Sequence, residues 1–207
     1  SEAISGSLFV GSKDTYTHAI LNPPYTKNQT NSIHQKSLRR AGIETVNLYS
    51  GFLALTLEQL MTGGHLVAIV PRSFCTGPYY QPFREYVFQR SAKKRLHLFK
   101  SRTNAFKSDS VLQENVIIHL QRGVGNKQIL ISSNSDDEFN DLTIFECNHC
   151  EIIGPASIGL IVSIPSCCPS TNRQSPSQSF NNKLPDLGVS VSTGPVVDFR
   201  LKEYLLP

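Results

Sequence analysis

The sequence contains no long hydrophobic run and no strong excess of charge of either sign. No stretch of about 18 consecutive apolar residues is present, which argues against a membrane-spanning helix. The first residues, SEAISGSLFV, lack the charged-then-apolar pattern of a secretory signal. The formal net charge of +4 suits a polyanionic partner but is far from a basic tail that binds nucleic acid by itself. We therefore expect a soluble, cytoplasmic protein with no membrane partner.

Neither end of the sequence has the features expected of the end of a complete chain. The first residue is not Met, and the last residues, LKEYLLP, stop abruptly. We expect from this that the sequence is a piece of a longer chain.

Cysteines are few, and the sequence gives no reason to expect disulfides. Five are present in a chain without a secretory signal, where a disulfide framework is not expected. Four of them, with His149 between the first two, offer a candidate zinc site: Cys147, Cys150, Cys167 and Cys168. Adjacent cysteines rarely direct both thiolates at one ion, and structural zinc sites usually use two spaced pairs. We therefore expect isolated thiols and no metal.

Hydrophobic patterning predicts alternating strands and helices. Helical spacing predicts helices over 44–61 and 78–91, and apolar runs predict strands over 16–21, 65–71, 94–99, 114–120, 128–132, 142–147 and 158–164. Gly63 and Gly64 are expected to end the first helix, and the polar stretch 26–42 to form a loop, or a loop and a short helix. The initial strand-helix-strand order predicts a doubly wound α/β sheet, and the later short strands predict antiparallel pairing at its edge.

The composition changes towards the C-terminus. Residues 166–185 are rich in Ser, Pro, Asn and Gln and nearly free of aliphatic side chains, which is typical of a linker. We expect one domain over 1–165, a linker over 166–185, and the start of another module over 186–207.

The motif with chemical content is Asn22-Pro23-Pro24-Tyr25, which follows an apolar run that we expect to be a buried strand. Proline fixes φ and has no N–H, so this tetrapeptide forms a stiff, extended turn. In open α/β sheets, ligands bind at the carboxyl ends of strands. An ordinary proline turn is the alternative interpretation.

Two acceptors of this turn suit an amine substrate. The Asn22 carboxamide oxygen and the Pro23 carbonyl oxygen can together accept both hydrogens of one exocyclic amine. Such an amine becomes more nucleophilic because its lone pair is less delocalised into the ring, and Tyr25 is placed to stack on that ring. The motif therefore predicts methyl transfer to a planar amine or amide nitrogen.

The tetrapeptide matches the catalytic motif of amino-methyltransferases that use S-adenosylmethionine. The chain as a whole resembles the adenine-specific (N6) DNA methyltransferases of restriction-modification systems, through GIETVNLYSGFLAL, GGHLVAIVPRSF, LFKSRTNAFKSDSVLQENVIIHL and LGVSVSTGPVVDFR. The resemblance implies a Rossmann-like, S-adenosylmethionine-dependent methyltransferase sheet with antiparallel edge strands. It also implies double-stranded DNA as partner and residues 186–207 as the start of a target-recognition region.

The resemblance also implies roles for individual residues. Asn22, Pro23, Pro24 and Tyr25 would be catalytic, with Asn22 and Pro23 also adjoining the cofactor. Phe106 would be a second aromatic side chain that packs on the extruded base, although a core position is the alternative. Basic residues in loops near the strand ends would contact DNA phosphates, or else be solvated surface charges: Lys27, Arg39, Arg40, Arg102 and Lys107.

The sequence departs from this family at the cofactor site. The glycine-rich turn and the acidic residue that hold the cofactor have no counterpart before Asn22, and Gly6 or Ser7 stands where an Asp is expected. We therefore expect an incomplete sheet without its N-terminal cofactor-binding half, and an inactive isolated chain. The alternatives are a truncated remnant that binds DNA or another subunit, and a methyltransferase of RNA adenine or protein glutamine.

Overall fold

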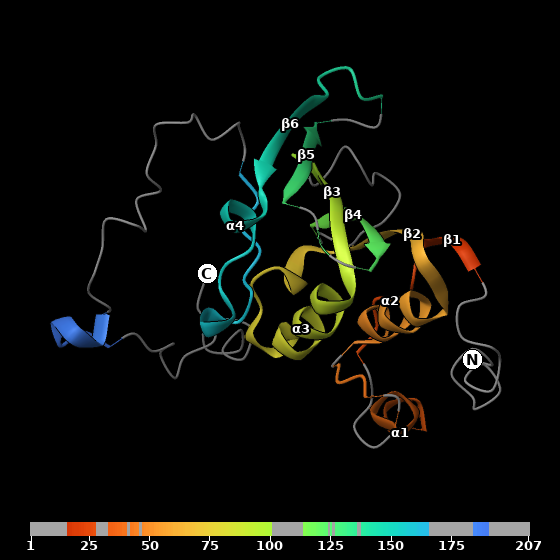
Figure 1. Cartoon of the computed structure of the whole chain (residues 1–207). Helices are drawn as coiled ribbons and strands as arrows, with labels where there is room; N and C mark the ends of the chain where they lie inside the picture. The colour runs from red at the N-terminus through yellow and green to blue at the C-terminus, as the bar shows by residue number, and fades with distance from the viewer. Residues whose placement is uncertain are drawn as a thin grey trace, which may run out of the picture. The chain divides into compact units, whose positions relative to one another are not determined.

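The computed structural model describes residues 16–27, 33–40, 42–45, 47–100, 114–123, 125, 127–135, 138–165 and 184–190. The chain divides into two compact units, Ser1–Cys168 and Pro169–Pro207. The first contains a six-stranded mixed sheet with the order β1-β2-β4-β3-β5-β6 (Figure 1). In the second, the described residues form one short 3₁₀ helix, Leu184–Leu187. None of the described helices is long and apolar enough to cross a membrane.

The strands are β1 Tyr16–Leu21, β2 Leu60–Pro71, β3 Ser91–Phe99, β4 Asn115–Arg122, β5 Gln128–Asn134 and β6 Thr143–Asn148. The helices are α1 Ile33–Arg40, α2 Leu48–Gln59, α3 Gln81–Arg90 and α4 His149–Ile152, with short 3₁₀ helices at Arg72–Phe74, Pro78–Tyr80 and Ala156–Ile158. β1 is parallel to β2, and β3 is parallel to β5. These parallel pairs and the helices that connect the strands confirm the α/β class.

The core lies where α2 and α3 pack on the sheet (Figure 1). Alternate residues of β2 and β4 supply its sheet side, because successive side chains of a strand point to opposite faces. The buried side chains from these strands are Leu66, Ala68, Val70, Val116, Ile118 and Leu120, and the helices contribute Leu53, Leu57, Phe83 and Val87.

β1 has the predicted bounds but not the predicted burial. It lies at the edge of the sheet, with Ile20 exposed over 87% of its surface and Tyr16 over 56%. Ala19 and Leu21 pack against the core from the other face. The expectation of a buried strand was wrong because a short apolar run does not reveal whether a second strand pairs on each side.

The helix predicted over 44–61 is α2, and it stops at Gln59. Gly63 and Gly64 therefore do not end it, because both lie within β2. Gly63 has φ +85°, a conformation that favours glycine. At Gly64 a Cβ atom would lie 2.9 Å from the Met61 carbonyl oxygen and 3.0 Å from that of Thr17. Gly63 therefore allows the turn of the backbone, and Gly64 allows β1 and β2 to approach near an irregularity in their register.

The later strands are arranged differently from the prediction. β4 is antiparallel, but it lies inside the sheet between β2 and β3, and β5 pairs in parallel with β3. Among the strands that the structure describes, only β6 is an antiparallel edge strand. Residues 158–164 form no strand and contribute an isolated bridge between Ile153 and Val162. The sequence pattern identifies strands, but it does not identify their neighbours.

Candidate active site

The tetrapeptide Asn22-Pro23-Pro24-Tyr25 lies directly after β1, at the edge of the sheet where β2 also ends. The parallel ladder continues to the pair Leu21 and Ala68, so Asn22 is the first residue beyond it. Pro23 is buried and Asn22 is exposed. The turn is thus anchored by a proline and presents its amide at the surface, at the carboxyl end of β1, where open α/β sheets bind ligands.

Tyr25 is held from two sides. Its hydroxyl donates to the carbonyl oxygen of Ile69 in β2 at 3.5 Å. Its ring meets Tyr49 in an edge-to-face contact, with centroids 6.3 Å apart and planes at 84°. Both contacts fix the orientation of a half-buried ring, so stacking on a substrate can use only its accessible part.

The chain after Tyr25 is tied to the first turn of α2. The Leu48 amide donates to the Thr26 carbonyl oxygen at 3.0 Å, and the backbones of Lys27 and Asn47 form an isolated antiparallel β-bridge. The Asn47 side-chain amide donates to the Tyr80 hydroxyl. The tetrapeptide is therefore held by β1 on one side and by the start of α2 on the other.

Tyr49 links the turn to the core. It is fully buried, and burial raises the pKa of its phenol. Its ring centroid lies 5.8 Å from that of Tyr80 and 6.4 Å from that of Phe83. Sequence reasoning placed Tyr49 in a buried helix but missed its contact with Tyr25 and the role of Asn47. The one available signal was a polar aromatic residue at the start of a mostly apolar helix.

Arg84 fixes the loop that follows β2 at the same edge. It is 1% exposed and donates to three carbonyl oxygens: Phe74 at 2.7 Å, Gly77 at 2.9 Å and Gly159 at 2.8 Å. Burial lowers the pKa of this guanidinium, and the three carbonyls replace part of its lost hydration. The loop is thereby held against the segment around Gly159.

Three of the five predicted DNA-contacting residues are described. Lys27 is exposed, close in sequence to the tetrapeptide, and Arg39 and Arg40 are exposed in the last turn of α1. α1 is anchored by buried Leu38, whose side chain occupies the space beside Gly51 of α2. Arg102, Lys107 and Phe106 lie outside the described residues.

The described residues fit only part of a cofactor site. Asn22 and Pro23 offer polar atoms at the end of β1, but exposed Ile20 shows that no described segment covers that face of β1. For zinc, Cys147 is buried and Cys150 is exposed, while Cys167 and Cys168 lie outside the described residues. Among the described residues, no group of three or more His, Cys, Asp or Glu side chains is arranged to hold a metal.

Comparison with known proteins gives a consistent family. Residues 5–106 match the Eco57I restriction-modification methylase family. The chain is 46% identical over 202 residues to the Type II methyltransferase M.BsuBI of Bacillus subtilis, a match covering 96% of this chain and 40% of that protein. It is 43% identical over 199 residues to the Type II methyltransferase M.PstI of Providencia stuartii, covering 92% and 38%. The chain therefore spans about 40% of the length of these relatives.

Solved structures share the fold at low sequence identity. A structure of the type I R-M system matches with a TM-score of 0.59 at 12% identity, covering 80% of this chain and 41% of that chain. The type IIG restriction endonuclease BpuSI matches with a TM-score of 0.52 at 16% identity, covering 65% and 19%. Both share the mixed α/β fold of this chain.

Proposed function

Because residues 5–106 match the Eco57I restriction-modification methylase family, we propose that this chain is the part of an adenine N6 DNA methyltransferase that carries the catalytic turn. The reaction transfers a methyl group from S-adenosylmethionine to the exocyclic amine of an adenine flipped out of duplex DNA. The observation that carries this proposal is the tetrapeptide Asn22–Tyr25 at the carboxyl end of β1, clamped by β2 and α2.

Asn22 and Pro23 act on the amine. Their oxygens accept its two hydrogens, which leaves the nitrogen lone pair free to form the new N–C bond. S-adenosylmethionine supplies an electrophilic methyl group, and the methyl-to-sulfur bond breaks as the N–C bond forms. One amine proton then passes to solvent. The buried position of Pro23 and its missing N–H keep the turn extended throughout.

The DNA contacts follow from base flipping. An adenine inside a duplex hides its amine, so the base must leave the stack and find aromatic support. Tyr25 and Phe106 are proposed to supply that support. Exposed Lys27, Arg39 and Arg40, together with Arg102 and Lys107, are proposed to contact phosphates.

The domain assignment belongs to the same proposal. Residues 1–165 form the C-terminal part of the catalytic domain, 166–185 a linker, and 186–207 the start of the target-recognition region. The sequence before Asn22 has neither the glycine-rich turn nor the acidic residue expected of the cofactor site, so the isolated chain is expected to be inactive. Its place of action is the cytoplasm, where restriction-modification enzymes meet DNA.

A chimera tests the proposal. In M.BsuBI, the segment that matches this chain is replaced by residues of this sequence, which the 46% identity over 202 residues makes practical. The chimera is expected to transfer tritiated methyl groups to duplex DNA, and nucleoside mass spectrometry is expected to find N6-methyladenine. Asn22→Ala is expected to lower the rate about 100-fold or more, since it removes one of two positioned acceptors.

Asn140→Ala is the matched control, because Asn140 is an exposed asparagine on the β5–β6 connection. It should leave the rate unchanged. The isolated chain, tested in parallel by calorimetry, is expected not to bind S-adenosylmethionine. A folded chimera that methylates RNA or protein instead, or whose Asn22→Ala variant keeps full activity, would overturn the proposal.

A further inference from the structure

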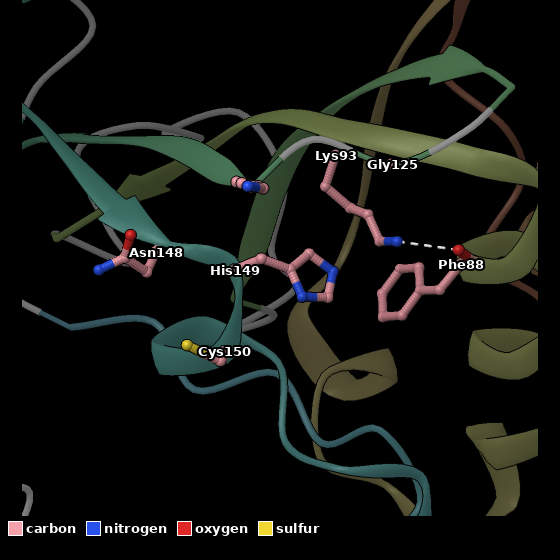
Figure 2. A pocket seen from close by; sticks show the side chains of 7 residues that line it. Phe88, Lys93, Gly125, Asn148, His149 and Cys150 are labelled. Carbon is pink, nitrogen blue, oxygen red and sulfur yellow. Dashed lines mark hydrogen bonds between the residues drawn. The ribbon is translucent and has the colours of Figure 1, made fainter.

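A pocket opens at the end of the sheet opposite to Asn22, where β3 begins and β6 ends. It has a volume of about 590 Å³, and its lining includes Phe88, Lys93, Lys127, Asn148, His149 and Cys150 (Figure 2). β1 is parallel to β2, and both β2 and β3 are antiparallel to β4. β1 and β3 therefore run in the same direction. From Lys93 to the carboxyl end of β3 at Phe99 the strand extends roughly 20 Å. The pocket is therefore separate from the candidate active site.

Lys93 is a buried ammonium group without a counter-ion among the described residues. The residue is 4% exposed, and its Nζ donates to the carbonyl oxygens of Phe88 at 2.9 Å and Ser91 at 3.1 Å. Two of its three N–H donors are used in this way. Burial lowers the pKa of Lys93 to about 8, because a buried charge has lost its hydration.

His149 and Lys127 bring further nitrogen atoms to this pocket. The His149 ring points towards the Lys93 ammonium from the opposite wall (Figure 2). Burial, and then the charge of Lys93, lower the pKa of His149. The His149 amide donates to the Lys127 carbonyl oxygen at 2.8 Å, which fixes Lys127 at the exposed rim. No carboxylate belongs to the described lining, and the Glu151 carboxylate beside it accepts from the Asn148 amide at 2.7 Å, so the polar side chains of the lining itself are neutral or positive.

We propose that this pocket binds the phosphate group of a small phosphorylated molecule. A phosphate dianion accepts N–H donors from Lys93 and His149 and supplies the counter-charge that Lys93 lacks. The volume exceeds that of a bare phosphate and suits a ligand of mononucleotide size, with the Phe88 ring as an apolar wall. The distance from the catalytic edge favours a free ligand over a phosphate of the DNA at Asn22.

The alternative is that Lys93 binds no ligand and only stabilises the C-terminal end of α3. Phe88 lies in the last turn of that helix, and a lysine that bonds a terminal carbonyl oxygen stabilises the helix end. This alternative predicts no ligand, so a binding measurement separates the two.

Calorimetry at pH 7 in a phosphate-free chloride buffer tests the proposal on the chain as it stands. The probes are inorganic phosphate and uridine 5′-monophosphate, which has no adenine to enter the active site. Both are expected to give saturable heats, with the nucleotide at least as tight as phosphate. Lys93→Met and His149→Gln are each expected to weaken binding about tenfold or more, whereas Lys94→Met, a neighbouring lysine outside the lining, leaves it unchanged.

His149→Gln keeps the test informative if Lys93→Met does not fold, because no hydrogen bond of the His149 ring contributes to the described fold. Circular dichroism establishes folding for each variant. Absence of a saturable heat with both probes would overturn the proposal, as would binding that neither variant weakens. Binding of a short DNA duplex alone, lost in Lys93→Met, would overturn the assignment to a small molecule.

Discussion

Single residues hold the Asn22–Tyr25 turn in place, and Tyr49 is one of them. It touches Tyr25, Tyr80 and Phe83 through ring contacts. Tyr49→Leu is expected to lower the free energy of unfolding by about 2 kcal/mol, since aromatic pairs add to the cost of lost buried area. Tyr49→Phe keeps the ring and is expected to stay within about 1 kcal/mol of the parent. Urea unfolding measures both.

The same two variants in the chimera distinguish positioning from simple stability. Tyr49→Leu is expected to lower the methylation rate at temperatures where the protein stays folded, because Tyr25 loses its support. Tyr49→Phe should be close to the parent. Equal rates for both variants would show that Tyr49 does not position Tyr25.

The burial of Lys93 leads to a prediction about how the free energy of unfolding depends on pH. Its pKa is about 8 in the folded chain, against 10.5 for an ordinary lysine. Below pH 8 both folded and unfolded chains carry the proton, so the cost of burying the charge is fully present. Between about 8 and 10.5 only the unfolded chain binds the proton, so stability rises with pH, by on the order of 3 kcal/mol in total.

Urea unfolding in phosphate-free buffer from pH 7 to 10 measures this effect as the difference between the parent and Lys93→Met. The parent is expected to gain stability relative to the variant as the pH rises. Parallel curves would show that Lys93 does not carry a buried charge.

Sequence reasoning at the residue scale succeeded where the chemistry is local. Asn22 to Tyr25 are adjacent, so their composition alone predicted a turn at a strand end. Asn47 and Tyr49 lie more than twenty positions away, and their role depends on how α2 packs. Lys93 lay between the helix predicted over 78–91 and the strand predicted over 94–99, because the sequence does not show that β3 begins at Ser91 or that its register shifts beside Lys93.

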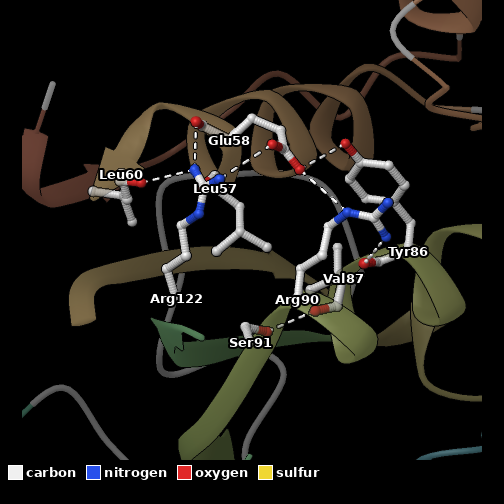
Figure 3. A network of polar contacts seen from close by, with 8 residues as sticks. All are labelled: Leu57, Glu58, Leu60, Tyr86, Val87, Arg90, Ser91 and Arg122. Carbon is white, nitrogen blue, oxygen red and sulfur yellow. Dashed lines mark hydrogen bonds and ion pairs between the residues drawn. The ribbon is translucent and has the colours of Figure 1, made fainter. Parts of the chain in front are cut away.

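At the scale of elements, α2 is closed by a side chain rather than by glycine. Arg122 of β4 donates to the carbonyl oxygens of Leu57 at 2.9 Å, Leu60 at 2.7 Å and Glu58 (Figure 3). The Glu58 carboxylate also accepts from Tyr86 at 2.8 Å and pairs with Arg90 at 3.3 Å. This network joins α2, α3 and β4 around one carboxylate.

Arg122→Met is therefore expected to destabilise the chain by about 2 kcal/mol, because it removes charged hydrogen bonds to the end of α2. Arg72→Met is the matched control. Its ion pair with Glu114 has side chains 42% and 33% exposed, and such pairs contribute less than about 1 kcal/mol. Thermal unfolding compares the two, and an equal loss in both would contradict the capping role of Arg122.

Element types were more predictable than element order. β1 has the bounds given by its apolar run, and most other elements were identified within a few residues. The position of β4 between β2 and β3 was not predictable, because pairing depends on contacts between segments about fifty residues apart. Gly63 and Gly64 were misplaced because a glycine pair signals both a helix end and a close backbone approach.

At the scale of the whole molecule, the outer edge of β1 is the exposed feature with most consequence. An edge strand offers unpaired backbone groups, and Ile20 adds an apolar side chain that is 87% exposed. The isolated chain is expected to self-associate at high concentration, and Ile20→Lys to reduce this. Light scattering coupled to size exclusion measures both.

Ile144→Lys is the matched control, since Ile144 is 52% exposed on β6 at the other edge of the sheet. It should leave the association unchanged if β1 is responsible. A chain that stays monomeric at all concentrations would show that the β1 edge does not drive association.

The interior position of β4 also sets the order in which the protein can be made. During synthesis β2 and β3 emerge first, but each pairs with β4 rather than with the other, and β4 is the last of the three in the chain. The two halves of the sheet, β1 with β2 and β3 with its later partners, are thus joined only after residue 122 has left the ribosome. Until then the nascent chain carries β2 and β3 without the strand that they share, so we expect folding to be slow and apolar strands to be exposed during synthesis.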